Sequence, residues 1–479
     1  MLLSTGIFWD DWSIIGVSQE TLKDQFINNG VTIGYYFHLP FWKLGSPWVY
    51  HLLTFILYGI TYLLVGKILR AKPFNIASEK AWTTVFILDV LPFNESKITA
   101  ICSFYTVSIF LFVLGFYLFH CRTDLKWKIL GAVSILLSFL TPSISFYYII
   151  VLLVTAAIEY CNSSFTIWIK RTVIHGFKKY GLYGLIAILS FVAYKSTFKP
   201  NEVSQAGYNQ ISNNQILRMP IEMVKVTYIN GIEFYQQIGK LAKNHWLLVI
   251  ILGMCTTALM YSKRNQSKDK QSLWIFLAGL VLWFMAMVPY IAVGKLPTFY
   301  EHLARHHLLT PIGFSLMVVG GLYVLKGWYF RLGFNTLIVF FASITFTQYL
   351  NYQAEDLKMK WLGNELSEKS TIAKENTFII DDRAEHYKSN ENPNRYYSWA
   401  GLLHQFTGKQ DKFMGTEEEL EYTNNYPEKY CLAEFNMKDY VPEMEADAHI
   451  VIFDQPLDDW KIFKSYFSET EIKLIYNIK

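Results

Sequence analysis

The chain has 479 residues, of which 52% are hydrophobic, 17% are aromatic and only 17% are charged. A soluble domain usually carries about 25% charged residues, so this composition excludes an ordinary water-soluble protein. The net charge of +4 is too small to indicate a nucleic-acid-binding protein. Apolar runs fill the chain to about Tyr349, and polar residues return after it. We therefore expect a transmembrane domain with external loops over residues 1–350 and a polar domain over residues 351–479.

The N-terminal segment alternates between polar and aromatic residues from Asp10 to Pro47. Residues 18–27 have the spacing of a short amphipathic helix, which we expect to lie on the membrane surface. An aromatic cluster follows, as is typical of the boundary between headgroups and hydrocarbon. Its members are Tyr35, Tyr36, Phe37, Phe41, Trp42 and Trp48.

The apolar runs predict about ten membrane spans. The first, residues 48–69, would be about 33 Å long as a helix, enough to cross the hydrocarbon core. The predicted spans are 48–69, 81–91, 98–119, 129–140, 144–159, 181–198, 246–261, 273–293, 308–325 and 334–350. The fold class expected is therefore mainly α, a polytopic transmembrane helical bundle.

Alternate loops between these spans are rich in Lys and Arg, which the positive-inside rule assigns to the cytoplasm. The loops expected outside are 10–47, 92–97, 199–245 and 295–307, together with the C-terminal domain. We thus predict a multi-pass protein of the plasma (inner) membrane with an extracytoplasmic C-terminal domain. This topology puts Met1 outside with no span before it. Either the first residues reach the outside without a span, or an upstream apolar helix is missing from this chain; we favour the second interpretation, a start site placed too far downstream.

The polar domain contains three predicted strands, at residues 377–380, 448–453 and 471–476, and a polar helix at 351–374 leads into it. Short strands between helical or irregular stretches are typical of a small α/β domain. The turn Asp381-Asp382-Arg383 and the aromatic residues Tyr396, Tyr397 and Trp399 could contact an acceptor glycan. We favour the alternative interpretation, a turn and surface aromatics.

The first candidate site is Asp10-Asp11, between Trp9 and Trp12. A hydroxyl that attacks an anomeric carbon needs a base, and a carboxylate within hydrogen-bond reach can serve. The alternative is a solvated loop in which an aspartate caps a helix. We favour the catalytic interpretation because the pair stands at a membrane face ahead of many spans.

An acidic pair in the first external loop, about ten spans and an external C-terminal domain together resemble the GT-C superfamily of membrane glycosyltransferases. The resemblance covers the architecture of the whole chain and one short motif. It implies a polyprenyl-phosphate sugar donor, with Asp10 as the base and Asp11 as its partner. In that family the acidic residues follow a first transmembrane helix, so the resemblance also implies a helix before Met1.

The second candidate site is the loop 295–307, between two late spans. A departing lipid phosphate needs positive charge, and Arg305 offers a two-pronged donor for it. The predicted phosphate-binding residues are Arg305, Lys295, His306 and His307. The alternative is that these residues anchor the loop to lipid headgroups. A zinc site made by His302 and His306 lacks a third ligand, and we do not favour it.

Three further residues are predicted to line the same cavity: Asp89, Glu301 and His302. Asp89 is the carboxylate that lies deepest in an apolar run, where an ionised group is costly. The alternative is that Asp89 only caps a loop. Lys195 and Lys199, at the outer end of a span, could assist a phosphate but more often such residues simply end a helix.

From these residues and the resemblance we predict an inverting transferase that moves a sugar from a polyprenyl phosphate to a cell-envelope glycan or glycolipid at the outer face of the bilayer. A divalent metal, Mg²⁺ or Mn²⁺, at Asp10 and Asp11 stays open, because two carboxylates are too few ligands. One alternative is a polymerase or ligase of lipid-linked polysaccharide. A less favoured one is a flippase or other transporter, since the spans are nearly uncharged and show no matching halves.

Overall fold

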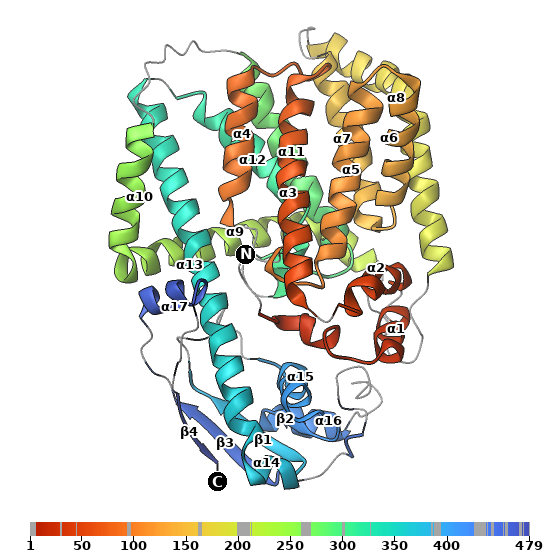
Figure 1. The fold of residues 1–479 in the computed structure, drawn as a ribbon. Coiled ribbons are helices and arrows are strands. Elements are labelled where there is room, and N and C mark those ends of the chain that lie inside the picture. The colour runs from red at the N-terminus through yellow and green to blue at the C-terminus, as the bar shows by residue number, and fades with distance from the viewer. Residues whose placement is uncertain are drawn as a thin grey trace.

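A helical bundle and a small β-sheet make up the part of the chain that the structure, a computed structural model, describes (Figure 1). The described residues are 6–28, 31–44, 46–92, 97–160, 165–198, 211, 213–259, 270–298, 302–325, 327–384, 387, 394–425, 437, 439–441, 445–453, 455, 458–468, 472 and 474–478.

The helices of the bundle run back and forth along one axis (Figure 1). They are α3 (Pro47–Arg70), α4 (Ser78–Val90), α5 (Ser103–Cys121), α6 (Leu125–Ser138), α7 (Pro142–Glu159), α8 (Phe165–Thr197), α10 (Trp246–Leu259), α11 (Lys270–Ile291), α12 (Thr310–Leu322) and α13 (Trp328–Ser367). Each overlaps one predicted span. Among the described residues, five helices are long and apolar enough to cross a membrane, namely α3, α5, α7, α11 and α13. The count of about ten spans therefore stays a prediction.

Local sequence explains where several of these helices begin and end. Pro47 and Pro142 are the first residues of α3 and α7, a position where proline's missing N–H costs nothing. Lys67 and Arg70 lie in the last turn of α3, where they complement the helix dipole. Large apolar side chains from α3 to α13 then form one core, in which Phe112, Tyr147 and Phe341 are almost fully buried.

Three helices lie at the end of the bundle that faces the sheet: α1 (Gln19–Asn28), α2 (Thr32–Trp42) and α9 (Asn213–Asn244) (Figure 1). The helix predicted at residues 18–27 is confirmed by α1. The loop 199–245, which we expected outside, contains the single long helix α9 among its described residues. The basic loop between α3 and α4 lies at the opposite end of the bundle (Figure 1).

The C-terminal part contains a four-stranded sheet in the order β2-β1-β3-β4. The strands are β1 (Thr377–Asp382), β2 (Phe413–Gly415), β3 (Ala448–Phe453) and β4 (Ile475–Ile478). β1 pairs in parallel with β2 and β3, and β3 pairs antiparallel with β4. The helices around it are α14 (Ser370–Lys374), α15 (Tyr396–Thr407), α16 (Glu417–Asn425) and α17 (Asp459–Ser465). The strands predicted at 377–380 and 448–453 are confirmed, whereas the last strand begins at Ile475 rather than at 471.

α13 joins the two parts, because it runs from the bundle down to the sheet without a break (Figure 1). The separate helix predicted at 351–374 is therefore wrong in its start: the chain continues α13 to Ser367 and then forms α14. Lys358 of α13 donates to Asp382 of β1 at 2.8 Å, and both side chains are buried. This ion pair fixes the helix against the sheet. The predicted border at residue 350 lies inside α13 and stays a prediction.

Candidate functional site

The segment η1 (Trp9–Ser13), a short 3-10 helix, lies between the bundle and the sheet domain. Trp12 is 4% exposed and belongs to the apolar core of the sheet domain. It packs on Gly401 of α15, where a Cβ atom would come within 2.8 Å of the indole ring. Asp11 points the other way, into the bundle. Trp12 thus anchors η1 to the sheet domain and Asp11 anchors it to the bundle. Asp10 lies where these two parts meet.

Asp11 is fully buried and accepts two backbone hydrogen bonds from the segment before α5. The N–H of Ala100 donates to Oδ2 and the N–H of Ile101 donates to Oδ1, each at 2.8 Å. Burial raises the pKa of Asp11 to about 7, although these N–H groups favour the charged form. Both oxygens of Asp11 are therefore committed to the protein backbone, and this side chain positions η1.

Asp10 is partly exposed, with 29% of its side chain accessible. Its Oδ2 accepts from Nη1 of Arg305 at 2.5 Å, and its Oδ1 accepts from the hydroxyl of Tyr397 at 3.0 Å. Arg305 is 295 positions away in sequence and Tyr397 is 387 positions away. The side chains of Asp10 and Arg305 both reach solvent, so a substrate can approach this pair.

Tyr397 comes from the second residue of α15, in the sheet domain. Burial, together with the negative charge of Asp10, raises the pKa of Tyr397 well above its ordinary value. The phenol therefore stays protonated at neutral pH and donates to the carboxylate. The sequence predicted an aromatic surface around Tyr397, but it gave no signal that this hydroxyl would reach Asp10.

Arg305 belongs to η3 (His302–His307), a 3-10 segment between α11 and α12. His307, two residues later, is fully buried. Its Nδ1 lies 2.9 Å from Oγ1 of Thr310, at the start of α12. Burial lowers the pKa of His307 to about 3. His307 is therefore uncharged at neutral pH and out of reach of solvent, which does not fit the predicted role in binding a phosphate.

The other predicted cations of this loop have different positions. His306 is 6% exposed and its ring centre lies 5.1 Å from that of Tyr290 in α11, so it packs in the bundle and does not fit the predicted contact with phosphate. Lys295 is partly exposed, and its charge acts on Lys195 of α8. These two lysines thus form a second cationic group, while Lys199 lies outside the described residues.

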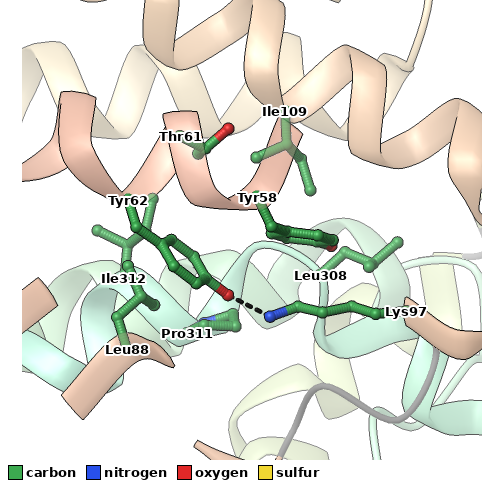
Figure 2. Close-up of a pocket in the computed structure, with 9 residues that line it drawn as sticks. All are labelled: Tyr58, Thr61, Tyr62, Leu88, Lys97, Ile109, Leu308, Pro311 and Ile312. Atoms are coloured by element: carbon green, nitrogen blue, oxygen red, sulfur yellow. Dashed lines mark hydrogen bonds between the residues drawn. The ribbon is translucent and has the colours of Figure 1, made fainter. Parts of the chain in front are cut away.

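Lys97, which the sequence analysis did not single out, is buried between spans beside the same region. Its ammonium donates to the hydroxyl of Tyr62 and lies 4.0 Å from the ring centre of Tyr58 (Figure 2). A small cavity surrounds it, lined by Tyr58, Thr61, Tyr62, Leu88, Lys97, Ile109, Leu308, Pro311 and Ile312. Asp89 acts on the charge of Lys97 and is not among these lining residues. Its predicted role, to line a cavity shared with Asp10, stays a prediction.

The structure thus brings together Asp10 and Arg305, the two residues on which the predicted chemistry depends. It separates Asp10 from Asp11, whose burial does not fit direct contact with a substrate. Glu301 and the side chain of His302 lie outside the described residues.

The metal expected at Asp10 and Asp11 does not fit these surroundings. The oxygens of Asp11 face backbone N–H groups, and those of Asp10 face Arg305 and Tyr397. Elsewhere, the described part of the chain contains no group of three or more His, Cys, Asp or Glu side chains that could hold a metal ion. The metal requirement stays a prediction.

Comparison of the sequence with protein-family models and with curated proteins found no match. Comparison with solved structures found a match to the crystal structure of ArnT from Cupriavidus metallidurans in the apo state. The match covers 97% of this chain and 92% of that chain, with 10% sequence identity and a TM-score of 0.32. A likeness at this level does not assign a function, so the assignment depends on the site itself.

Proposed function

We propose that the chain is an integral membrane glycosyltransferase of the GT-C type. It transfers a sugar from a polyprenyl phosphate to a cell-envelope glycan or glycolipid at the outer face of the bilayer. The single observation that carries the proposal is the contact of Asp10 with Arg305 at one end of an apolar helical bundle. A base and a phosphate-binding cation are the two groups that this reaction needs. Here they lie 295 positions apart in the sequence and meet in the fold.

In this mechanism the carboxylate of Asp10 accepts the proton of an acceptor hydroxyl as its oxygen attacks the anomeric carbon. The bond from that carbon to the phosphate oxygen breaks in the same step, and the polyprenyl phosphate leaves. Such a single displacement inverts the configuration at the anomeric carbon. Asp11 takes no part in the proton transfer, since it anchors η1 through Ala100 and Ile101.

Arg305 can contact both Asp10 and the phosphate of the donor. A guanidinium presents several N–H donors in one plane, so it can keep one bond to Asp10 and offer the others to the donor phosphate. The positive charge then offsets the negative charge that grows on the departing phosphate, where fixed charges are most effective. Lys295, on the same loop as Arg305, adds a further positive charge to this part of the chain. The phosphate would thus bind the N–H groups of Arg305 that do not contact Asp10.

The test is transfer of radiolabelled sugar from polyprenyl phosphate by membranes that contain the full chain. Asp10→Asn keeps the shape of the side chain and removes the base, so we expect transfer to fall at least about 100-fold. Asp24→Asn, which changes an exposed carboxylate of α1, is the matched control and should transfer at the original rate.

The same assay separates the rival functions. Full transfer by Asp10→Asn, with loss of transfer in Arg305→Gln, would instead favour a polymerase or ligase of lipid-linked polysaccharide. Movement of labelled lipid across the bilayer without transfer would favour a flippase. Either result would remove Asp10 from the mechanism proposed here.

A further inference from the structure

Helix α9 has 32 residues and lies across the other helices of the bundle, at the end that faces the sheet (Figure 1). At 1.5 Å per residue it is about 48 Å long. It packs against α10, α11 and α13 on one side only. Its position beside the ends of the spans is that of a helix in the plane of a membrane surface.

One face of α9 is apolar and exposed. Its members are Leu217, Ile221, Val224, Tyr228 and Tyr235, and each is between 68% and 79% exposed. Steps of three, four and seven residues keep these side chains on one stripe of a helix. The opposite face is buried against the bundle through Val226 and Asn230. Nothing in the described part of the chain covers the stripe.

The charges beside the stripe and the apolar surface of the neighbouring helix α10 indicate what covers it. The exposed cations of α9 flank it on one side: Arg218, Lys225, Lys240 and Lys243. The helix carries two carboxylates, Glu222 and Glu233, so its net charge is positive. At its end, α10 exposes a second apolar surface through Trp246, Ile250 and Met254. An apolar stripe bordered by cations and continuous with an apolar helix of the bundle fits anionic lipid headgroups above acyl chains.

The buried face of α9 contacts the loop that carries Arg305. The side-chain amide of Asn230 donates to the carbonyl of Pro297 at 3.1 Å and lies 3.5 Å from Nε2 of His307. These contacts hold both ends of the segment between α11 and α12. These contacts therefore link the position of α9 to that of the loop that carries Arg305.

We infer that the apolar stripe of α9 docks on the headgroup layer of the bilayer and thereby holds Arg305 at the level of the lipid phosphates. The lipid contact is independent of the reaction, whereas the consequence for Arg305 rests on the proposed function. In this position α9 holds Arg305 at the depth at which the phosphate of a lipid-linked donor lies in the bilayer.

The contact can be tested by photo-crosslinking in the full chain, reconstituted in vesicles of phosphatidylethanolamine and radiolabelled phosphatidylglycerol. A photoreactive phenylalanine analogue replaces Leu217, Val224 or Tyr228 in the stripe. Glu417, exposed on α16 in the sheet domain and away from the stripe, is the matched control position. We expect radiolabelled adducts at the three stripe positions and at least fivefold less label at position 417. Crosslinks to a second copy of the chain, or equal label at all four positions, would overturn the inference.

A second arm measures the link to Arg305. Val224→Asp puts a charge in the stripe without touching the site, so we expect the KM for the polyprenyl donor to rise several-fold while kcat changes little. An unchanged KM would overturn the proposed control of depth. If the original chain transferred no sugar, the proposed function would fail, but the crosslinking result would still decide whether lipid covers the stripe.

Discussion

Two hydrogen-bond donors hold the carboxylate of Asp10, one on each oxygen. Arg305 lies at 2.5 Å from Oδ2 and the phenol of Tyr397 at 3.0 Å from Oδ1. Because the donors come from different parts of the chain, they fix both the position and the rotation of the carboxylate. A base held this way needs little reorganisation when the acceptor hydroxyl arrives. Tyr397 is therefore a positioning residue that the sheet domain adds to the site.

We expect Tyr397→Phe to lower kcat about 10- to 100-fold, because a hydrogen bond to a charged group contributes about 1.5–3 kcal/mol. The KM for the donor should change little, since Arg305 is untouched. Tyr396→Phe, whose ring stacks on Phe413 instead, is the control. Identical kcat values in both variants would contradict a role for the Tyr397 hydroxyl.

The sequence predicted the pair of residues at the centre of this site but not its surroundings. Asp10 and Arg305 were predicted to share one side of the membrane, because loop charge alone orders the spans. The different environments of Asp10 and Asp11 could not be predicted, since they depend on backbone N–H groups about 90 positions away. The same holds for Tyr397, whose contact needs the sheet domain to fold against the bundle.

At the scale of elements, α11 and α12 determine where Arg305 lies, because η3 connects them. The two helices approach so closely that a Cβ atom on Gly313 would come within 2.3 Å of the backbone nitrogen of Trp283. Gly279 and Gly320 meet the facing helix in the same way. Small residues at such positions let helix backbones touch in a membrane.

Gly313→Leu should therefore force α12 away from α11. We expect the variant to lose about 1–3 kcal/mol of stability from overpacking and to unfold several degrees lower in detergent, followed by tryptophan fluorescence. Transfer should fall with it, since Arg305 moves with the start of α12. Gly59→Leu in α3 is the matched control, because no atom lies within 4 Å of a Cβ there. Equal melting temperatures in the two variants would show that the close approach does not matter for stability.

The predicted elements agree with the structure where an apolar pattern is long. They fail where an element is very short, or where one helix contains two stretches of different composition. The apolar run at 48–69 corresponds to α3, Pro47–Arg70, within one residue at each end. β2 has three residues, too few for an alternation to be visible in sequence. α13 was divided at residue 350 because its composition changes there, yet the backbone hydrogen bonds of a helix continue regardless of whether lipid or protein surrounds it.

At the scale of the whole molecule, η1 joins the two folded parts at the site. Trp12 is part of the core of the sheet domain, and Asp11 is held by the segment before α5. Asp10, between them, can meet Arg305 and Tyr397 only when the sheet domain lies on the bundle. The site therefore exists only in the assembled chain, and all of its parts must face the same side of the membrane.

This geometry makes sidedness testable at one position of the sheet domain. Glu417 of α16 is exposed near the sheet, whereas Thr123 is exposed in a basic loop of the bundle, between α5 and α6. In a variant without the five native cysteines, we expect a membrane-impermeant maleimide to label Glu417→Cys in intact cells. Thr123→Cys should be labelled only after the cells are permeabilised. The opposite pattern would put Asp10 and Arg305 in the cytoplasm, and transfer at the outer face of the bilayer could not then be the reaction.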